Sequence, residues 1–349
     1  MPITHIFNAA IILNDRILKR SSVTIKDFKI TKIGKLPPKG AALINARGLY
    51  LAPGFIDTHI HGSPDEIVRN ETRYGTTAFV IAVSCGRPTP KISACPSILG
   101  IRHEGPFINQ SMAGAQNKRF IRKTMAKTGS FKDPVLKAHP KMMTLAPEIP
   151  GVETLIKFCK QNGVIPSIGH SDASYEEAKK SFDVGIRHAT HLFNAMSGPR
   201  HGTAGAGLAA LFDKRVTVEV IGDLKHVSAG LLRLVFAIKD PSKIILITDS
   251  VRAERLSCPQ HSGRLNVRYA GGCSHIINCV KNAVKYCGVN LTDAVIMASA
   301  NPARLFGIEK QKGSIAPGKD ADIVLFDKNF NVKFTIRGGK IVYQNKGIR

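Results

Sequence analysis

The sequence contains no tryptophan and few acidic residues for its size. Against 50 Lys and Arg it has 25 Asp and Glu, so the formal net charge is +25. A charge of this size attracts anions, among them phosphorylated sugars and nucleic acids. The basic residues are scattered, however, and no interleaved aromatic pattern, helix-turn-helix, RNA-binding motif or zinc finger accompanies them. We therefore expect no specific nucleic-acid partner and interpret the charge as a solvated basic surface.

Cysteine pairs and long apolar runs are missing as well. The seven cysteines are an odd number and none lies in a CxxC motif, which favours reduced thiols over a disulfide framework or a zinc-thiolate site. No apolar run reaches the roughly 18 residues that a membrane span needs. The N-terminus lacks the basic start and apolar stretch of a secretory signal. These absences predict a cytoplasmic protein with no membrane partner.

Both ends of the chain have the pattern of short β-strands. Residues Ser22–Lys26 alternate between polar and apolar, which is typical of a half-buried strand. The expected strands are Ile6–Leu13, Val23–Lys26, Lys29–Ile33, Ile323–Phe326, Val332–Ile336 and Lys340–Tyr343. The simplest arrangement is one small β-sandwich domain built from residues 1–52 and 309–349.

Between the two ends, residues 53–308 alternate between apolar strand-like runs and amphipathic helical stretches. The expected strands are Phe55–Thr58, Thr77–Val83, Ile98–Ile101, Met142–Leu145, Val164–Ile168, Arg187–Thr190, Val216–Ile221 and Ile244–Thr248. The expected helices are Val152–Gln161, Tyr175–Phe182, Ala229–Ile238, Ile276–Tyr286 and Leu291–Leu305. Eight strands that alternate with helices predict the α/β class and a closed (β/α)8 TIM-like barrel.

Two histidines, His59 and His61, end the first of these strands. Residues two apart on a strand point to the same face, so both can bind one metal ion. An isolated pair of this kind is more often a surface or core feature. Here, histidines and carboxylates also follow five other strands, at Glu104, His170, His191, Asp223, His226 and Asp249. Reactive groups of such barrels lie at the carboxyl ends of the strands, which favours one shared site.

Imidazole and carboxylate groups are ligands that zinc or iron(II) takes, with a position left for water. A metal ion lowers the pKa of that water towards neutrality, so that hydroxide is available as a nucleophile. A hydrolase also needs a group that moves the water's proton to the leaving amine, and Asp249 is placed for this role. The alternative for Asp249 is an N-cap of the segment that follows it.

A series of short motifs then carries a resemblance. In chain order they are Pro53–Gly62, Glu104–Phe107, Gly114–Gln116, Leu145–Glu148, Gly169–Ala178, Thr190–Met196, Asp223–Val227, Thr248–Ser250, Asn301–Arg304 and Gly313–Asp322. Together they cover essentially the whole chain. The chain resembles the amidohydrolase superfamily and, within it, the family of N-acetylglucosamine-6-phosphate deacetylases. The segments EGPF, GHSDAS and THLFNAM are specific to that deacetylase family.

The resemblance implies a role for each matching position. Glu104, His170 and His191 would hold the main divalent ion (zinc, iron, cobalt or manganese), His59 and His61 would serve a second or adjoining ion, and Asp249 would be the general base and acid. One or two ions per subunit and a homodimer are implied. The residues implied at the sugar phosphate are Ala115, Gln116, Asn194, Ala195, His226, Ala270, Gly271 and Gly272.

Several positions depart from the family pattern. Arg102 and His103 stand where the family has His and Leu, Gly202 stands in place of a phosphate-binding arginine, and Leu224 replaces a glycine. Arg200 is a basic residue that could substitute for that arginine. The connections Ser63–Tyr74 and Ser84–Ser97 are short, so we expect stunted helices there.

The implied reaction converts N-acetyl-D-glucosamine 6-phosphate to D-glucosamine 6-phosphate and acetate. Two alternatives remain open because of these departures. One is an amidohydrolase that acts on another N-acylated amino sugar. The other is a catalytically weakened homologue that binds a sugar phosphate or a nucleic acid, and metal analysis would distinguish it.

Overall fold

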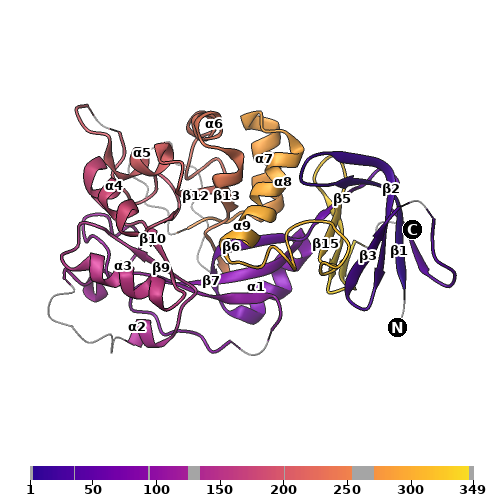
Figure 1. Ribbon diagram of the computed structural model, residues 1–349, viewed down its shortest axis with the longest axis horizontal. Helices are drawn as coiled ribbons and strands as arrows, with labels where there is room; N and C mark the ends of the chain where they lie inside the picture. The colour runs from indigo at the N-terminus through magenta and orange to yellow at the C-terminus, as the bar shows by residue number, and fades with distance from the viewer. Residues whose placement is uncertain are drawn as a thin grey trace.

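The computed structural model describes residues 3–34, 36–92, 95–124, 134–199, 201–253 and 271–345. Two β-sheets organise this part of the chain. Figure 1 shows a small all-β region on the right, where both chain ends lie, and a larger region of strands and helices on the left. The division of the chain into two domains, with the boundaries given above, stays a prediction.

The small region is one eight-stranded sheet drawn from both ends of the chain. Its strands are β1 (Thr4–Ile12), β2 (Ile17–Lys26), β3 (Lys29–Ile33), β4 (Ala42–Asn45), β5 (Tyr50–Pro53), β15 (Ile323–Phe326), β16 (Val332–Arg337) and β17 (Lys340–Gln344). They follow the order β17-β16-β15-β5-β1-β2-β3, and β4 also pairs with β1. Antiparallel pairing of Leu51 with Leu325 joins the two chain ends. All eight strands belong to one hydrogen-bonded sheet, and the two-layer sandwich stays a prediction.

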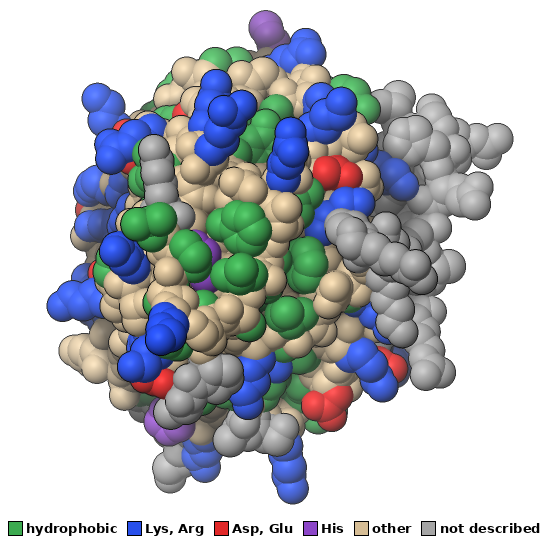
Figure 2. All heavy atoms as spheres, turned by 90° about the vertical axis from the view of Figure 1, so that its right-hand side faces the viewer, with side chains coloured by type: hydrophobic (Ala, Val, Ile, Leu, Met, Phe, Trp, Pro, Cys, Tyr) green, Lys and Arg blue, Asp and Glu red, His purple; other side chains and the backbone are tan. Residues whose placement is uncertain are grey.

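Figure 2 views the molecule from the side of this small sheet. Apolar side chains lie in the middle of the face, and Lys and Arg are spread around them rather than gathered in one patch. Exposed apolar side chains of the small sheet include Phe28, Leu43 and Ile341. On this face the basic residues fit the expected solvated basic surface.

The larger sheet has nine parallel strands in the order β13-β12-β11-β10-β9-β8-β7-β6-β14. Their bounds are β6 (Phe55–Gly62), β7 (Thr76–Val83), β8 (Ile98–Glu104), β9 (Met142–Leu145), β10 (Ile165–Ile168), β11 (His188–Ala189), β12 (Thr217–Ile221), β13 (Ile244–Ile247) and β14 (Ser250–Ala253). All eight residues of β7 are buried, as expected for a parallel strand covered on both faces.

The sheet curls so that its two edges meet. Strand β14 follows β13 after only Thr248 and Asp249, yet it pairs with β6 at the other edge, with Ser250 opposite Ile60. The Asp249 amide donates to the carbonyl of His59 at 2.9 Å. The Thr248 hydroxyl donates to the Asp57 carboxylate at 2.5 Å. The eighth strand position is thus split into β13 and β14, and together they join the first strand to the seventh.

Helices surround the curled sheet (Figure 1). They are α1 (Pro64–Glu71), α2 (Pro134–Lys137), α3 (Val152–Gln161), α4 (Tyr175–Val184), α5 (Gly205–Phe212), α6 (Ala229–Ile238), α7 (Ile276–Cys287), α8 (Leu291–Met297) and α9 (Ala300–Leu305). Short 3-10 turns are η1 (Thr72–Tyr74), η2 (Lys118–Phe120) and η3 (Pro241–Lys243). As expected, α1 is short, and the described residues between β7 and β8 contain no helix.

The structure departs from the predictions in three places. The single helix expected over Leu291–Leu305 is two helices, because Pro302 lacks the N–H that would bond to Ala298 in a continuous helix. Helix α5 was not predicted, since its Gly- and Ala-rich sequence is apolar on all sides. Cys273 is disulfide-bonded, contrary to the expected reduced thiols, while the five other described cysteines are free.

The core of the larger region packs helices onto the sheet. Leu145 and Val218 from the strands are fully buried with Leu155, Phe182 and Val280 from the helices. Within the described ranges, no helix is both long enough and apolar enough to cross a bilayer.

Candidate active site

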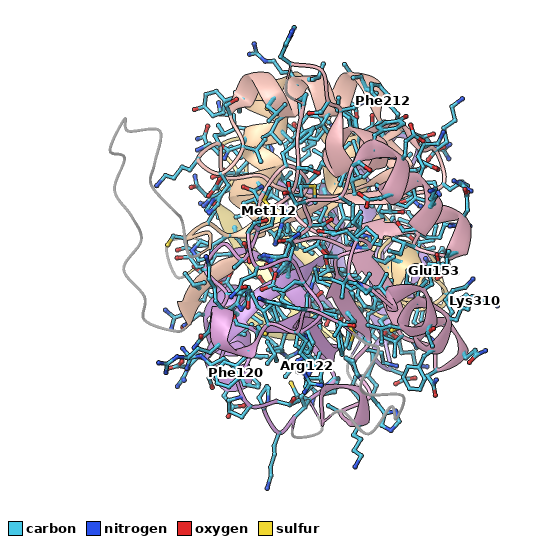
Figure 3. The ribbon with its side chains drawn as sticks, turned by 90° about the vertical axis from the view of Figure 1, so that its left-hand side faces the viewer. Met112, Phe120, Arg122, Glu153, Phe212 and Lys310 are labelled. Atoms are coloured by element: carbon cyan, nitrogen blue, oxygen red, sulfur yellow. The ribbon has the colours of Figure 1, made fainter. Side chains whose placement is uncertain are left out.

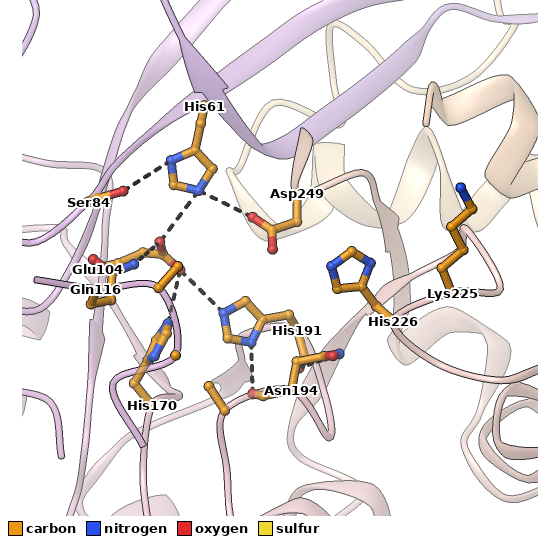
Figure 4. Close-up of a pocket in the computed structure, with 13 residues that line it drawn as sticks. His61, Ser84, Glu104, Gln116, His170, His191, Asn194, Lys225, His226 and Asp249 are labelled. Carbon is orange, nitrogen blue, oxygen red and sulfur yellow. Dashed lines mark hydrogen bonds and ion pairs between the residues drawn. The ribbon is translucent and has the colours of Figure 1, made fainter. Parts of the chain in front are cut away.

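The predicted metal ligands and the predicted catalytic residue converge at the carboxyl ends of the parallel strands. They surround a cavity of about 340 Å³, shown in Figure 4. His61 comes from β6 and Glu104 from β8, while His170, His191 and Asp249 follow β10, β11 and β13 by two residues each. His59 lies beneath them on β6 and is fully buried. The strand-end pattern therefore brings six predicted residues together.

The backbone turns sharply where these side chains enter the cavity. His170, His191 and Asp249 have φ angles of 48°, 29° and 47°. Such left-handed conformations are uncommon outside glycine and concentrate at functional sites, where the surrounding structure maintains them. In each case the turn follows a strand directly, so the strand ends and the side chain points inward.

The Glu104 carboxylate lies at the centre of the histidine cluster. Its Oε1 is 3.2 Å from His59 Nε2, 3.4 Å from His170 Nε2 and 3.3 Å from His191 Nε2. Its Oε2 is 3.5 Å from His61 Nε2 and accepts a hydrogen bond of 2.7 Å from the Gln116 amide. Gln116, which was expected at the sugar, thus contacts a predicted metal ligand.

Asp249 faces two of these histidines from the junction between β13 and β14. Its Oδ1 is 3.3 Å from His59 Nε2 and 3.2 Å from His61 Nε2. The residue leads into β14 and no helix follows directly, so the N-cap interpretation is wrong. Gly272 supports this backbone, since its N–H donates to the Asp249 carbonyl at 2.6 Å and a Cβ on it would lie 2.1 Å from the Thr248 oxygen.

The other ring nitrogen of each histidine is held from outside the cavity. The Nδ1 atoms of His170 and His191 donate to the carbonyls of Met112 and Asn194, at 2.9 and 3.1 Å. Met112 lies on the loop after β8, labelled in Figure 3. The remaining contacts are His59 Nδ1 with Glu219 at 3.3 Å and His61 Nδ1 with the Ser84 hydroxyl at 3.5 Å.

This arrangement fits a divalent metal ion. Four Nε2 atoms point inward with two carboxylates, and outer partners set the ring orientations, as is usual for metal-binding histidines. His59 Nε2 is buried between the carboxylates of Glu104 and Asp249, at 3.2 and 3.3 Å. Two groups have ligand atoms close enough to share an ion, namely His59, Glu104 and His191, and His59, His61 and Asp249. His59 belongs to both groups, whereas the resemblance assigned it to a second ion.

Sequence reasoning missed a charged cluster directly below the site. Arg102 Nη1 lies 2.6 Å from Glu219 Oε1, and the other oxygen of Glu219 contacts His59 Nδ1. Arg102 also donates to the hydroxyl of Thr190 at 2.9 Å. The available signals were a lone carboxylate in the apolar run Val216–Ile221 and the placement of Arg102 two residues before Glu104, on the same strand face.

The charges of the cluster lower the pKa of Glu104 and raise the pKa of His59. Burial alone would raise the pKa of Glu104, but attraction to His59 and hydrogen bonds from His170, His191 and His59 hold it well below its usual range. Burial and Arg102 would lower the pKa of His59, yet Asp249 and Glu104 raise it to about 10. The carboxylates thus favour positive charge at this point, which a divalent cation would supply.

Only some of the residues expected at the sugar phosphate line the cavity. The cavity is lined by Ala115, Gln116, Asn194, Ala195 and His226. Gly271 and Gly272 pack against the backbone of residues 248–251 and are not among the lining residues that the structure describes. Ala270 and Arg200 lie outside the described residues. Gly202 lines a separate cavity of about 480 Å³.

Comparison with known proteins assigns the chain to a family. The model of the amidohydrolase family matches residues 91–342. The chain belongs to this family. Among the relatives of this amidohydrolase, N-acetylglucosamine-6-phosphate deacetylase of Bacillus subtilis (strain 168) is 30% identical, with 97% of this chain and 96% of the relative covered.

Two further similarities narrow the comparison. N-acetylgalactosamine-6-phosphate deacetylase of Escherichia coli O157:H7 is 27% identical, over 95% of this chain and 97% of the relative. The crystal structure of N-acetylglucosamine-6-phosphate deacetylase from Pasteurella multocida matches with a TM-score of 0.85 and 26% identity, over 98% of this chain and 100% of that chain. This amidohydrolase therefore shares the fold of a deacetylase over nearly its whole length.

Proposed function

We propose that the protein hydrolyses the acetamide of N-acetyl-D-glucosamine 6-phosphate, which yields D-glucosamine 6-phosphate and acetate. The observation that carries the proposal is the convergence of four histidine Nε2 atoms on Glu104 and Asp249 at one cavity. The names of the full-length relatives support the substrate. A cytoplasmic role in amino-sugar catabolism or recycling and a homodimeric assembly are part of the proposal.

Glu104, His170 and His191 would hold the main divalent ion, and His59 and His61 would serve a second or adjoining one. Zinc, iron, cobalt and manganese all suit such ligands, with one or two ions per subunit. When bound, the ion would polarise the amide carbonyl and lower the pKa of a water molecule. Outer contacts from Glu219, Met112 and Asn194 would keep the ring nitrogens aimed at this point.

Asp249 would move the proton. Its carboxylate faces the cavity and its backbone is held in place by His59 and Gly272. It would take a proton from the attacking water and give it to the leaving amine, which is general base and general acid catalysis by one group. The backbone at Asn194 and Ala195 and the side chain of His226, which line the cavity, would hold the sugar phosphate.

The direct test is acetate release from N-acetylglucosamine 6-phosphate by purified, metal-loaded protein. Asp249→Asn is the matched control, because the amide has the shape of the carboxylate and cannot serve as the base. We expect kcat to fall by roughly 10²- to 10⁴-fold in the variant. Metal content is measured for both proteins, so that loss of metal is separated from loss of the base. Wild-type turnover no greater than that of the variant would refute the proposal.

A second candidate substrate is N-acetyl-D-galactosamine 6-phosphate, which differs only in the orientation of the C4 hydroxyl. It is favoured by the relative whose name specifies that sugar. The two kcat/KM values, measured side by side, decide between the epimers. A protein that binds the sugar phosphate but takes up no metal would instead support a weakened binding homologue.

A further inference from the structure

We infer that Lys225 recognises the phosphate group of the substrate. The inference rests on the proposed function, because it takes the 6-phosphate from the substrate named there. Lys225 lines the cavity next to His226 and was not among the predicted site residues. Its role would be to set the preference for a phosphorylated sugar.

The first observation is the charge of the cavity wall. Among its described lining residues, Lys225 is the one lysine or arginine. The remaining lining residues are histidines, two carboxylates and neutral residues. The two carboxylates, Glu104 and Asp249, face the histidine cluster. A phosphate monoester carries between one and two negative charges at neutral pH, so its recognition requires a cation or several donors.

The second observation is the turn that presents Lys225. The Asp223 carboxylate accepts hydrogen bonds from the backbone amides of Lys225 and His226, at 2.8 and 3.0 Å. Its other oxygen contacts His226 Nδ1 at 2.8 Å. Asp223 thereby fixes the turn through the backbone of Lys225, while its side-chain partner is His226. Consecutive residues of one tight turn both reach the cavity wall.

Leu224 anchors the same turn to the core of the protein. Its φ angle is 63°, and its half-buried side chain packs against the core of the larger region. A leucine is strained in this left-handed conformation, and packing against the core maintains it here. A turn anchored at Asp223 and at Leu224 holds the backbone of Lys225 at the cavity wall.

The third observation is the position of Lys225 relative to the reacting groups. Figure 4 shows Lys225 beyond His226, on the side of the cavity away from His61 and Ser84. In an N-acetylated hexosamine 6-phosphate, the acetamide on C2 and the phosphate on C6 lie at opposite ends of the sugar ring. An acetamide placed at the histidine cluster directs the phosphate to the end where Lys225 lies.

The experiment compares binding with and without the phosphate. Glucosamine 6-phosphate and glucosamine are titrated calorimetrically into the full-length, metal-loaded protein and into Lys225→Met. We expect the methionine variant to bind glucosamine 6-phosphate at least about tenfold more weakly, as for the loss of one charged hydrogen bond. Lys225→Arg should retain most of the affinity. Lys328→Met, an exposed lysine between β15 and β16, is the matched control and should match the wild type.

The outcomes separate the two proposals. Wild-type affinity for glucosamine 6-phosphate in Lys225→Met would overturn the inference, and so would equal binding of the two sugars by the wild type. Absence of acetate release would refute the proposed reaction alone, because the binding comparison does not require turnover. Unfolding temperatures of the variants show whether they are folded, and we expect no change since Lys225 is exposed.

Discussion

Arg102 and Glu219 form a salt bridge of 2.6 Å inside the barrel, and neither side chain is exposed to solvent. The two residues are 117 positions apart in the chain. Through its second oxygen, Glu219 holds His59 by Nδ1 and leaves Nε2 directed at Glu104. The buried pair thus connects the middle of the barrel to the candidate metal site.

This connection predicts the effect of Glu219→Gln, which keeps the shape of the side chain and removes its charge. Leaving Arg102 unpaired in the interior should cost roughly 3–5 kcal/mol of unfolding free energy. Loss of the carboxylate that orients His59 should weaken metal binding by roughly 10- to 100-fold. Urea denaturation and the absorption of cobalt-loaded protein measure the two effects.

A control and a double variant show whether the effects come from the buried charge. Asp183→Asn removes an exposed partner of Arg215 and should change stability by less than about 1 kcal/mol. Arg102→Met combined with Glu219→Gln should recover stability without recovering metal affinity. Wild-type metal affinity in Glu219→Gln would show that the pair does not position His59.

Glu104→Gln should remove most bound metal, because Glu104 alone lies within 3.5 Å of the Nε2 atoms of His59, His61, His170 and His191 in the described structure. An amide retains one oxygen but loses the negative charge that balances a divalent ion. We expect at least a tenfold fall in metal content after dialysis, measured by mass spectrometry. Glu153→Gln, an exposed residue of α3, should retain the wild-type content. Equal content in both variants would contradict this ligand set.

Gly272→Ala should impair catalysis more than metal binding. The added methyl would lie 2.1 Å from the carbonyl oxygen of Thr248, so the segment that carries Asp249 must shift. We expect kcat to fall at least about tenfold, as for a misplaced catalytic group. Gly230→Ala is the control, since a Cβ at this position of α6 has open space and favours the helix. Full activity of Gly272→Ala would show that Asp249 tolerates the shift.

The lowered pKa of Asp213, a residue outside the candidate active site, predicts that the stability of the protein depends on pH. Hydrogen bonds from Arg215 lower the pKa of Asp213 to about 2 from its usual 3.8. The ionised folded form is favoured, so the stabilisation is complete above pH 3.8 and is lost as the pH falls through about 2. Asp213→Asn should have a lower urea midpoint than the wild type at pH 5, and the gap should narrow at lower pH. A gap that stayed constant down to pH 2 would contradict the assigned cause.

Much of this fold follows from apolar patterns in the sequence. The strand Met142–Leu145 and the helices Val152–Gln161 and Ala229–Ile238 have the predicted bounds. Strand β14 was not predicted, because its pairing with β6 depends on how the sheet curls rather than on its own four residues. Local periodicity carries no information about such closure.

The candidate site, too, could be predicted only in part from the sequence. His59, His61, Glu104, His170, His191 and Asp249 could be predicted to meet, because each follows or ends a strand and parallel strands present these ends together. Arg102 and Glu219 could not be paired, since the partner across a barrel interior is set by strand order and tilt. Gln116 was expected at the sugar, and only the path of the loop after β8 places its amide on Glu104. The roles of all these residues stay predictions.

The split of the eighth strand has a consequence for folding. Asp57 and Thr248, 191 residues apart, meet only when the two edges of the sheet join, and the same event brings Asp249 to His59. Contacts between such distant residues form slowly, because the entropy of closing a long loop is lost before the contacts contribute any stabilising free energy. The candidate ligand set is therefore complete only after the two edges of the sheet have joined. A metal ion that binds ligands from both edges would stabilise the closed sheet relative to the open one. Chelation should then speed unfolding as well as abolish turnover.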